Sequence, residues 1–258
     1  MRKRISLFLA FAMLLTVLAA CSDQNNNESS AGTLPTTSTF QSEGVESSMQ
    51  EKDDHHILIA YFTRLDNTDA TLDEIIQGGG PYGSLGSSLE DSDVDAIASA
   101  SITVVDGQVQ GNAETMAQMI ASVTGGELFS IQTSQSYPTN YDELINLGGE
   151  EKSQAYRPEL TTHMENMDEY DIIFLGYPNW WYDMPMAMYS FLEEYDLSGK
   201  TIIPFATSAG SGFSDSISTV QEMQPNASVM ENGLHIPMGD VANGQETIES
   251  WISELGVL

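Results

Sequence analysis

Aromatic and polar side chains gather where one buried strand is expected to end. The apolar run 172–175 is typical of a strand buried on both faces of a parallel sheet, and Gly176 and Pro178 end it. Trp180 and Trp181 follow directly. Ligands of open α/β sheets bind outside the carboxyl ends of the strands, so the two indoles are predicted to form walls for a flat, apolar ligand. The alternative is that both rings pack beneath their own loop.

Two further loops bring polar groups to the same expected edge of the sheet. Thr63-Arg64 follows an apolar run and is paired with a helix start at Asn112-Ala113, whose amide groups and dipole favour a phosphate without a lysine. The loop 207–213 is polar and glycine-rich. An aromatic wall, a polar backbone face and a phosphate site together indicate flavin mononucleotide (FMN). The alternative for Asn112 is an ordinary helix cap.

The rest of the chain supplies the elements that position these loops. Apolar runs predict strands over 57–62, 127–133, 171–176 and 201–206, with a weaker strand near 228–236. Helical periodicity and stop signals predict helices over 112–124, 139–156, 186–195, 214–223 and 245–255. This alternation is typical of an α/β fold with a doubly wound parallel sheet and helices on both faces. Pro204 is unusual within it, because proline cannot donate to a central ladder.

The segment 65–110 interrupts this alternation and is read as an insertion after the first strand. It contains glycines between positions 78 and 86, an acidic cluster at 90–95 and a minor strand at 102–105. Since it leaves the carboxyl end of the first strand, it is expected on the ligand side of the sheet. A lid over the site and a mobile surface loop both remain open.

The first residues are typical of a lipoprotein address. Basic residues at 2–4 precede an apolar run of about 13 residues, too short for the roughly 20 that span a bilayer. We predict a signal peptide over 1–20. Leu18-Ala-Ala-Cys21 looks like the lipobox of bacterial lipoproteins, which implies acylation of Cys21, the chain's one cysteine. We then expect a flexible tether over 21–54 and one domain over 55–258, held by lipid on the extracytoplasmic face of the cell membrane.

The charge balance narrows the partners. Of 38 acidic and 8 basic residues, the signal peptide removes three basic ones, which leaves a net charge of about −33. Such a surface excludes nucleic acid and is repelled by anionic lipid, so the acyl chain and not the folded surface should hold the protein at the membrane. The four histidines lack metal-ligand spacing, and no metal site is predicted.

Several motifs, in order along the chain, resemble the flavodoxin family. They are Ile59–Thr63, Gly111-Asn112 with Glu114, Thr124–Phe129, Tyr137-Pro138 with Tyr141, Arg157–Leu160, Tyr170–Trp181, Leu197–Ile203 and Thr207–Phe213. The closest resemblance is to lipoprotein and clostridial-type flavodoxins, in which Tyr-Pro-Asn-Trp-Trp is a signature. It implies a five-stranded sheet in the order 2-1-3-4-5, FMN at its carboxyl edge, and one- or two-electron transfer.

The resemblance also implies roles for residues at matching positions. Those expected to contact FMN are Thr63, Arg64, Asn112 and Ala113 at the phosphate, Pro178, Asn179, Trp180 and Trp181 at the ring, and Thr207, Ser208, Gly210 and Gly212 at its other edge. Asp66-Asn67-Thr68 is a competing match to the phosphate motif, but a periodic helix follows Gly111-Asn112 instead. Ala113 stands where the family usually has threonine. The loop 179–182 has no glycine, which makes a peptide flip there costly.

The function predicted from the sequence is electron transfer by an FMN-binding lipoprotein, with a redox protein or a small molecule as acceptor. No side chain is required as a general acid or base. Three alternatives remain: an FMN-dependent quinone-type reductase, a flavin-free ligand-binding lipoprotein of the same fold, and an esterase using Ser208, Asp215 and His235.

Overall fold

Strand β1 (Ile57–Tyr61) is an inner strand of a parallel sheet, paired with a strand on each side, and all of its residues are buried. They alternate between two apolar clusters: Ile57, Ile59 and Tyr61 face one side and Leu58 and Ala60 the other. The structure is a computed structural model, and it describes residues 55–69, 102–105, 108–138 and 141–257. A continuous apolar run therefore becomes a strand covered on both faces, as predicted.

The sheet follows the order β4-β1-β5-β6-β7, and β8 also pairs with β6. Its strands are all parallel and comprise, besides β1, β4 (Glu127–Ser130), β5 (Ile172–Pro178), β6 (Thr201–Ser208), β7 (Ser228–Val229) and β8 (Leu234–Pro237). The predicted fold class is confirmed. The strand order differs in detail, because two short strands share the position beside β6 that one strand was predicted to fill.

This divided strand explains how Pro204 is tolerated inside β6. The Ile202 carbonyl accepts the Met230 N–H at 2.9 Å on the β7 side, and residues two apart along a strand point the same way. The backbone nitrogen of Pro204 therefore points toward the same neighbouring position as Ile202. There it lies between the end of β7 at Val229 and the start of β8 at Leu234. No ladder hydrogen bond is lost where the neighbouring strand is interrupted.

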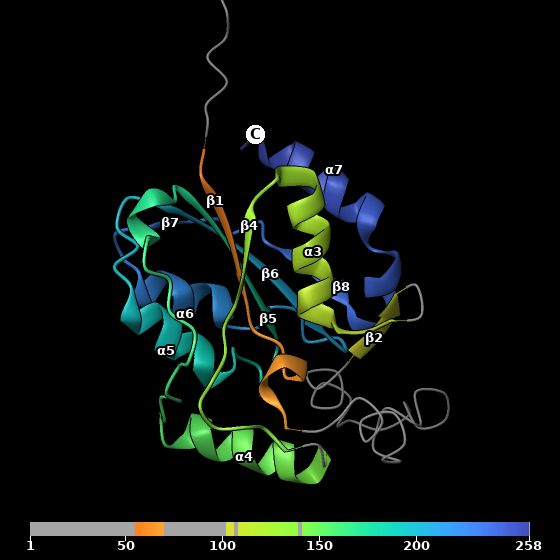
Figure 1. Cartoon of the computed structure of the whole chain (residues 1–258), viewed down its shortest axis with the longest axis vertical. Helices are drawn as coiled ribbons and strands as arrows, with labels where there is room; N and C mark the ends of the chain where they lie inside the picture. Colours follow the sequence, from red (N-terminus) through yellow and green to blue (C-terminus); the bar gives the residue numbers. More distant parts are fainter. Residues whose placement is uncertain (1–54, 70–101, 106–107, 139–140, 258) are drawn as a thin grey trace, which may run out of the picture. The chain divides into compact units, whose positions relative to one another are not determined.

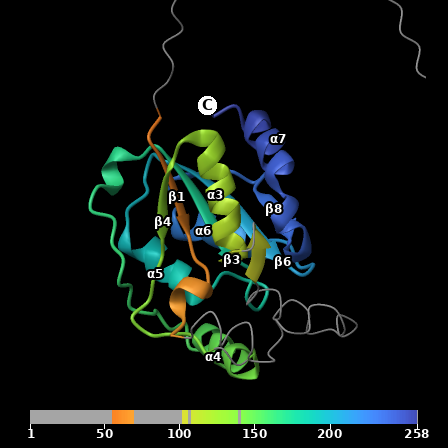
Figure 2. The same ribbon diagram turned by 45° about the vertical axis from the view of Figure 1, so that its right-hand side comes forward.

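Helices cover both faces of the sheet (Figures 1 and 2). Helices α3 (Asn112–Thr124) and α7 (Gln245–Leu255) pack on one face, and α5 (Met186–Glu194) and α6 (Ser216–Met223) on the other. Helix α4 (Tyr141–Ser153) lies beyond the carboxyl end of β1 (Figure 1). Three short 3-10 helices, η1 (Leu65–Asn67), η2 (Met167–Glu169) and η3 (Met238–Asn243), complete the described elements. The predicted bounds of α3 and α7 are confirmed, whereas α4, α5 and α6 are shorter than predicted.

The described end of the insertion forms a hairpin. Strands β2 (Ile102–Val105) and β3 (Gln108–Gly111) pair antiparallel, and β3 leads directly into α3. Residues 70–101 lie outside the described residues, as do the predicted signal peptide, Cys21 and the tether, so these predictions are not tested. Among the residues that the structure does describe, no helix is long and apolar enough to cross a membrane.

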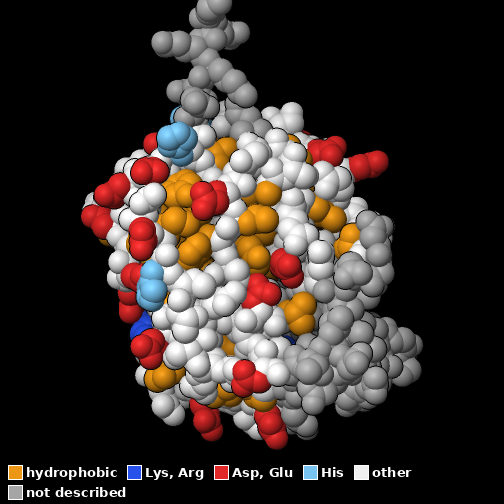
Figure 3. All heavy atoms as spheres, viewed as in Figure 1, with side chains coloured by type: hydrophobic (Ala, Val, Ile, Leu, Met, Phe, Trp, Pro, Cys, Tyr) orange, Lys and Arg blue, Asp and Glu red, His pale blue; other side chains and the backbone are white. Residues whose placement is uncertain are grey.

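The surface seen in Figure 3 carries many Asp and Glu side chains and very few Lys or Arg, as the composition requires. Apolar side chains also reach this face. Leu128 of the edge strand β4 is 42% exposed. The described surface is thus strongly acidic but not wholly polar.

Candidate functional site

The loops predicted to form the site leave the same edge of the sheet. Thr63 follows β1, Asn179 follows β5, and Thr207 and Ser208 end β6. These strands are parallel, so their carboxyl ends lie side by side. Phe62 N–H donates to the Gly176 carbonyl and Asn179 N–H to the Thr207 carbonyl, both at 2.9 Å, which continues the pairing into the loops.

The start of α3 lies against the end of β1. A Cβ placed on Gly111 would stand 1.9 Å from Thr63 Oγ1, so only glycine allows this approach. Asn112 then opens the helix at the predicted position, and Asn112 and Ala113 are buried. The amides of a first helical turn have no partner within the helix, which suits an anion beside the Thr63 hydroxyl.

The same helix start is also acidic. The Glu114 carboxylate accepts the Gly111 N–H at 3.2 Å and so takes up one of these amides. Burial raises the pKa of the Glu114 carboxyl above its usual range, and nearby Asp66 adds to this. Burial likewise raises the pKa of Asp66, partly offset by the hydroxyl of Ser130 that donates to it at 2.6 Å. A phosphate here would have to bind beside two carboxyls.

Arg64 places a cationic side chain at this end of the site. Only 2% of Arg64 is exposed, and its Nη1 donates to the Pro138 carbonyl at 2.7 Å. A buried guanidinium is retained where other groups compensate its charge or hydrogen-bond its donors. Its position is consistent with the predicted phosphate role, and it also ties β1 to the segment that leads into α4.

The competing motif at Asp66-Asn67-Thr68 has a structural role. Asn67 is buried, and its Nδ2 donates to the carbonyls of Thr63 and Ile131 at 2.8 and 3.1 Å. Its Oδ1 accepts the Thr133 N–H at 2.7 Å. With all of these groups paired inside the protein, Asn67 joins the loop after β1 to the loop after β4, and the assignment of the phosphate to Gly111-Asn112 stays a prediction.

The glycine-rich loop after β6 is organised around one hydroxyl. Ser208 is fully buried, and its Oγ accepts the N–H groups of Gly210 at 3.2 Å and Gly212 at 3.0 Å. The same Oγ lies 2.8 Å from Nε2 of His235. A serine enclosed in this way closes its own loop rather than presenting a nucleophile, which argues against the esterase alternative. Ser208 therefore shapes the loop, and its contact with a ligand stays a prediction.

Asn179 joins the second and third loops. Its Nδ2 donates to the Gly212 carbonyl at 3.0 Å and to Ser214 Oγ at 3.2 Å. Within the part of the chain that the structure describes, Asn179 Oδ1 and Thr207 Oγ1 are buried without a hydrogen-bond partner. Buried polar atoms are rarely left unpaired, so these two mark a place where a polar ligand group fits.

The two tryptophans do not act as a pair. Trp180 is buried, and its ring meets those of Phe62 and Tyr137 edge-on, with centroids 5.6 and 5.2 Å apart. Trp180 thus packs in the aromatic cluster under its own loop, as in the alternative given for the two indoles, and its contact with a ligand stays a prediction. Trp181 stays 46% exposed and is the indole that can meet a ligand.

Comparison with known families identifies the chain. The model of a family described as Flavodoxin matches residues 102–255, more than half of the 258 residues. The chain belongs to the flavodoxin family. The match begins in the insertion, so β1 and the Thr63-Arg64 pair lie before it. A comparison with curated proteins gave no match.

Two solved structures with TM-scores above 0.5 agree with this flavodoxin fold. A candidate flavoprotein from Bacteroides uniformis is 23% identical and covers 77% of this chain and 98% of its own, with a TM-score of 0.53. Another, from Bacteroides eggerthii, is 21% identical, with coverages of 80% and 100% and a TM-score of 0.52. A Lactobacillus acidophilus flavoprotein in complex with FMN is 15% identical, with coverages of 74% and 99% and a TM-score of 0.46.

Sequence reasoning missed the support that α4 gives to this flavodoxin's site. The buried Glu151 carboxylate accepts the Tyr137 hydroxyl at 3.2 Å, next to Trp180. Burial raises the pKa of Glu151 to about 7, although the hydrogen bond from Tyr137 acts in the opposite direction. One signal was available, since Gly148-Gly149 inside a predicted helix is unfavourable unless another group approaches closely. The described residues contain no cluster of three potential metal ligands.

Proposed function

We propose that this flavodoxin-family protein binds FMN at the carboxyl edge of its sheet and transfers electrons on the extracytoplasmic face of the cell membrane, held there through Cys21. The observation that carries the proposal is the pair of buried, unpartnered oxygens of Asn179 and Thr207 among the described residues at that edge, in a chain of this family. The bound flavin would supply one- and two-electron transfer through its isoalloxazine ring.

The residues present fit such a cofactor in two parts. Thr63, Arg64 and the first turn of α3 would hold the phosphate, while the loop 178–181 and the loop 207–212 would flank the ring. The room beside Gly210, where an added Cβ would meet nothing within 4 Å, leaves space at the second loop. Trp180 and Ser208 would act through the loops they support, and Trp181 would provide the aromatic face.

The first experiment is the visible absorption spectrum of the full-length protein, purified in detergent and measured again after FMN is added. We expect the two visible flavin maxima to be retained through gel filtration. A colourless protein that leaves the fluorescence of added FMN unchanged would contradict the proposal and favour the flavin-free binding module.

A matched pair of variants on β6 locates the site. Thr207→Val removes a hydroxyl that has no described partner, so FMN binding should weaken by roughly threefold to tenfold while the free energy of unfolding stays nearly constant. Thr201→Val makes the same change at the opposite end of β6 and should leave FMN affinity unchanged. Equal affinities of the two variants would contradict this placement of the cofactor.

The membrane part of the proposal is tested separately. Cys21→Ser should abolish incorporation of a radiolabelled fatty acid and release the protein from the membrane fraction, without changing FMN affinity. Retention of the label in the variant would contradict acylation at Cys21.

A further inference from the structure

The turn that carries Trp181 has a strained backbone. Trp180 and Asp183 pair as an antiparallel bridge, with N–H···O distances of 2.8 and 3.0 Å. The two residues between them, Trp181 and Tyr182, have φ values of 55° and 62°. Bulky side chains seldom adopt this left-handed conformation, which glycine, asparagine and aspartate tolerate best. Some other part of the protein must therefore hold the turn.

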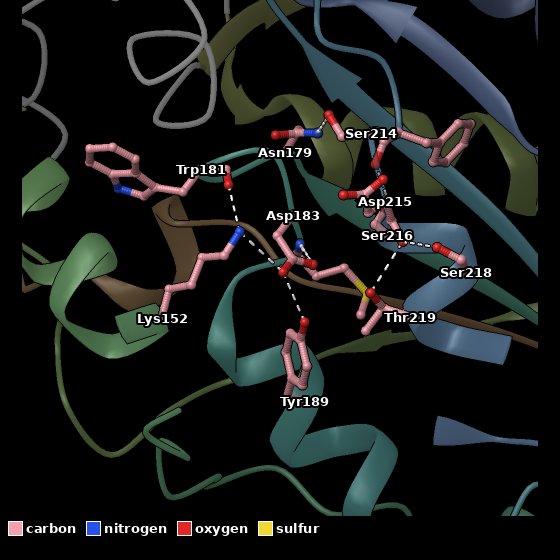
Figure 4. Close-up of polar contacts among 12 residues, drawn as sticks. Lys152, Asn179, Trp181, Asp183, Tyr189, Ser214, Asp215, Ser216, Ser218 and Thr219 are labelled. Atoms are coloured by element: carbon pink, nitrogen blue, oxygen red, sulfur yellow. Dashed lines mark hydrogen bonds and ion pairs between the residues drawn. The ribbon is translucent and has the colours of Figure 1, made fainter. Parts of the chain in front are cut away.

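The side chains of the turn do not hold it by their own burial, since Trp181 is 46% and Tyr182 62% exposed. Lys152 of α4 instead contacts the turn at two points (Figure 4). Its Nζ donates to the Trp181 carbonyl at 2.7 Å and pairs with Asp183 Oδ2 at 3.3 Å. Asp183 is fixed in turn by the Tyr189 hydroxyl, which donates to Oδ2 at 2.9 Å. Lys152 therefore hydrogen-bonds the carbonyl of the peptide group that links Trp181 and Tyr182, the two residues with positive φ.

The surface of α4 is shaped to receive both indoles. A Cβ on Gly148 would stand 3.4 Å from the Trp180 ring, and one on Gly149 would stand 3.3 Å from the Trp181 indole. The Trp181 Nε1 donates to the Ile145 carbonyl at 3.1 Å. Glycine weakens a helix interior, so two adjacent glycines here are explained by the close approach of the rings.

We propose that Lys152 is a positioning residue. Together with Gly148 and Gly149 it forms an α4 clamp that holds the Trp180–Asp183 turn in its strained conformation and fixes how Trp181 is presented at the carboxyl edge. The effect on the flavin rests on the function proposed above, whereas the hold on the turn is a property of the flavin-free protein.

The flavin-free protein provides the first readout. The chain has 3 tryptophans, and Trp180 and Trp251 are buried, so acrylamide quenching of the fluorescence reports mainly on Trp181. Lys152→Met should raise the quenching constant roughly twofold as the turn loosens. Lys152→Arg keeps a donor and a positive charge and should restore the wild-type value. Lys52→Met removes the same charge outside the described residues and should change nothing.

The second readout is FMN. Lys152→Met should raise the dissociation constant roughly threefold to tenfold and shift the midpoint potential, and Lys152→Arg should reverse both changes. Unchanged quenching in Lys152→Met would overturn the clamp. Altered quenching with unchanged affinity and potential would overturn the positioning role. If even the wild-type protein fails to bind FMN, the quenching result still decides the clamp, and the failure belongs to the proposed function.

A second variant covers the case in which Lys152→Met does not fold. Gly149→Ala favours the helix but places a Cβ against the Trp181 indole, so it should raise the quenching constant without lowering the melting temperature. Wild-type quenching and wild-type FMN affinity in this variant would overturn the role of the glycines in the clamp.

Discussion

The two loops at the ends of β5 and β6 reach their conformations by different means. The loop 207–213 places a glycine at its left-handed position, Gly212 with φ 64°, and closes on the Ser208 hydroxyl. The turn 180–183 places two aromatic residues in the same region of φ and depends on α4. The loop 207–213 therefore has its left-handed glycine and its closing hydroxyl in its own sequence, whereas the turn 180–183 depends on a helix that is distant in the chain.

The largest expected effect is on the pH dependence of stability, through Glu151 of α4, the helix that contacts the turn 180–183. The unfolded state releases the Glu151 proton at an ordinary pKa of 4.5, whereas the folded state keeps it to about pH 7. Between these values the unfolded state binds fewer protons, so stability falls as the pH rises. Between pH 4.5 and about pH 7 the free energy of unfolding falls by about 3 kcal/mol in total, and above the folded pKa it falls no further on account of Glu151.

Glu151→Gln should remove this dependence while keeping an acceptor for Tyr137. The variant should match the wild type near pH 4.5 and exceed its free energy of unfolding by up to about 3 kcal/mol at pH 8, measured by urea denaturation across the range. The half-buried Asp66 and Glu114 titrate in the same direction in both proteins, so the difference between the curves isolates Glu151. Parallel curves would contradict the prediction.

The next effect concerns the hydroxyl on which the loop 207–213 closes. Ser208→Ala leaves the Gly210 and Gly212 amides without their acceptor and should lower the free energy of unfolding by about 2 kcal/mol. Ser218→Ala is the matched control, because Ser218 is exposed and its hydroxyl donates to a nearby acceptor on the same helix start, the Asp215 carbonyl. Urea denaturation of the two variants should separate them clearly; a loss in Ser208→Ala no larger than in the control would mean that the loop does not depend on this hydroxyl.

Two glycines of the same loop give a smaller and more local contrast. Gly212→Ala forces a Cβ into a left-handed conformation and should cost about 1 kcal/mol. Gly210 has open space around it and no positive φ, so Gly210→Ala should be neutral or slightly stabilising. The melting temperatures of both variants show whether the loop needs glycine only where φ is positive, at Gly212, or at both positions. Equal melting temperatures would contradict this.

The same contrast explains what the sequence could predict. The individual strands, the start of α3 at Asn112 and the glycine-rich loop follow from short patterns of residues that are close together in the sequence. The burial of Trp180 does not, because Phe62 and Tyr137, which enclose it, are distant in the chain. The role of Lys152 could not be predicted either, since an exposed-looking lysine in a helix gives no indication that a carbonyl 29 residues further on will meet it.

The smallest expected effect is a gain in stability from a substitution in the turn 180–183. Tyr182→Asn puts a residue that tolerates the left-handed region at φ 62°, and the exposed tyrosine ring gives up little packing, so the free energy of unfolding should rise by about 0.5 kcal/mol. Tyr156→Asn, at another exposed tyrosine without a positive φ, should show no gain. If Tyr182→Asn is instead destabilising in urea denaturation, the aromatic ring itself contributes to holding the turn, and the difference between the two loops is smaller than their backbone angles indicate.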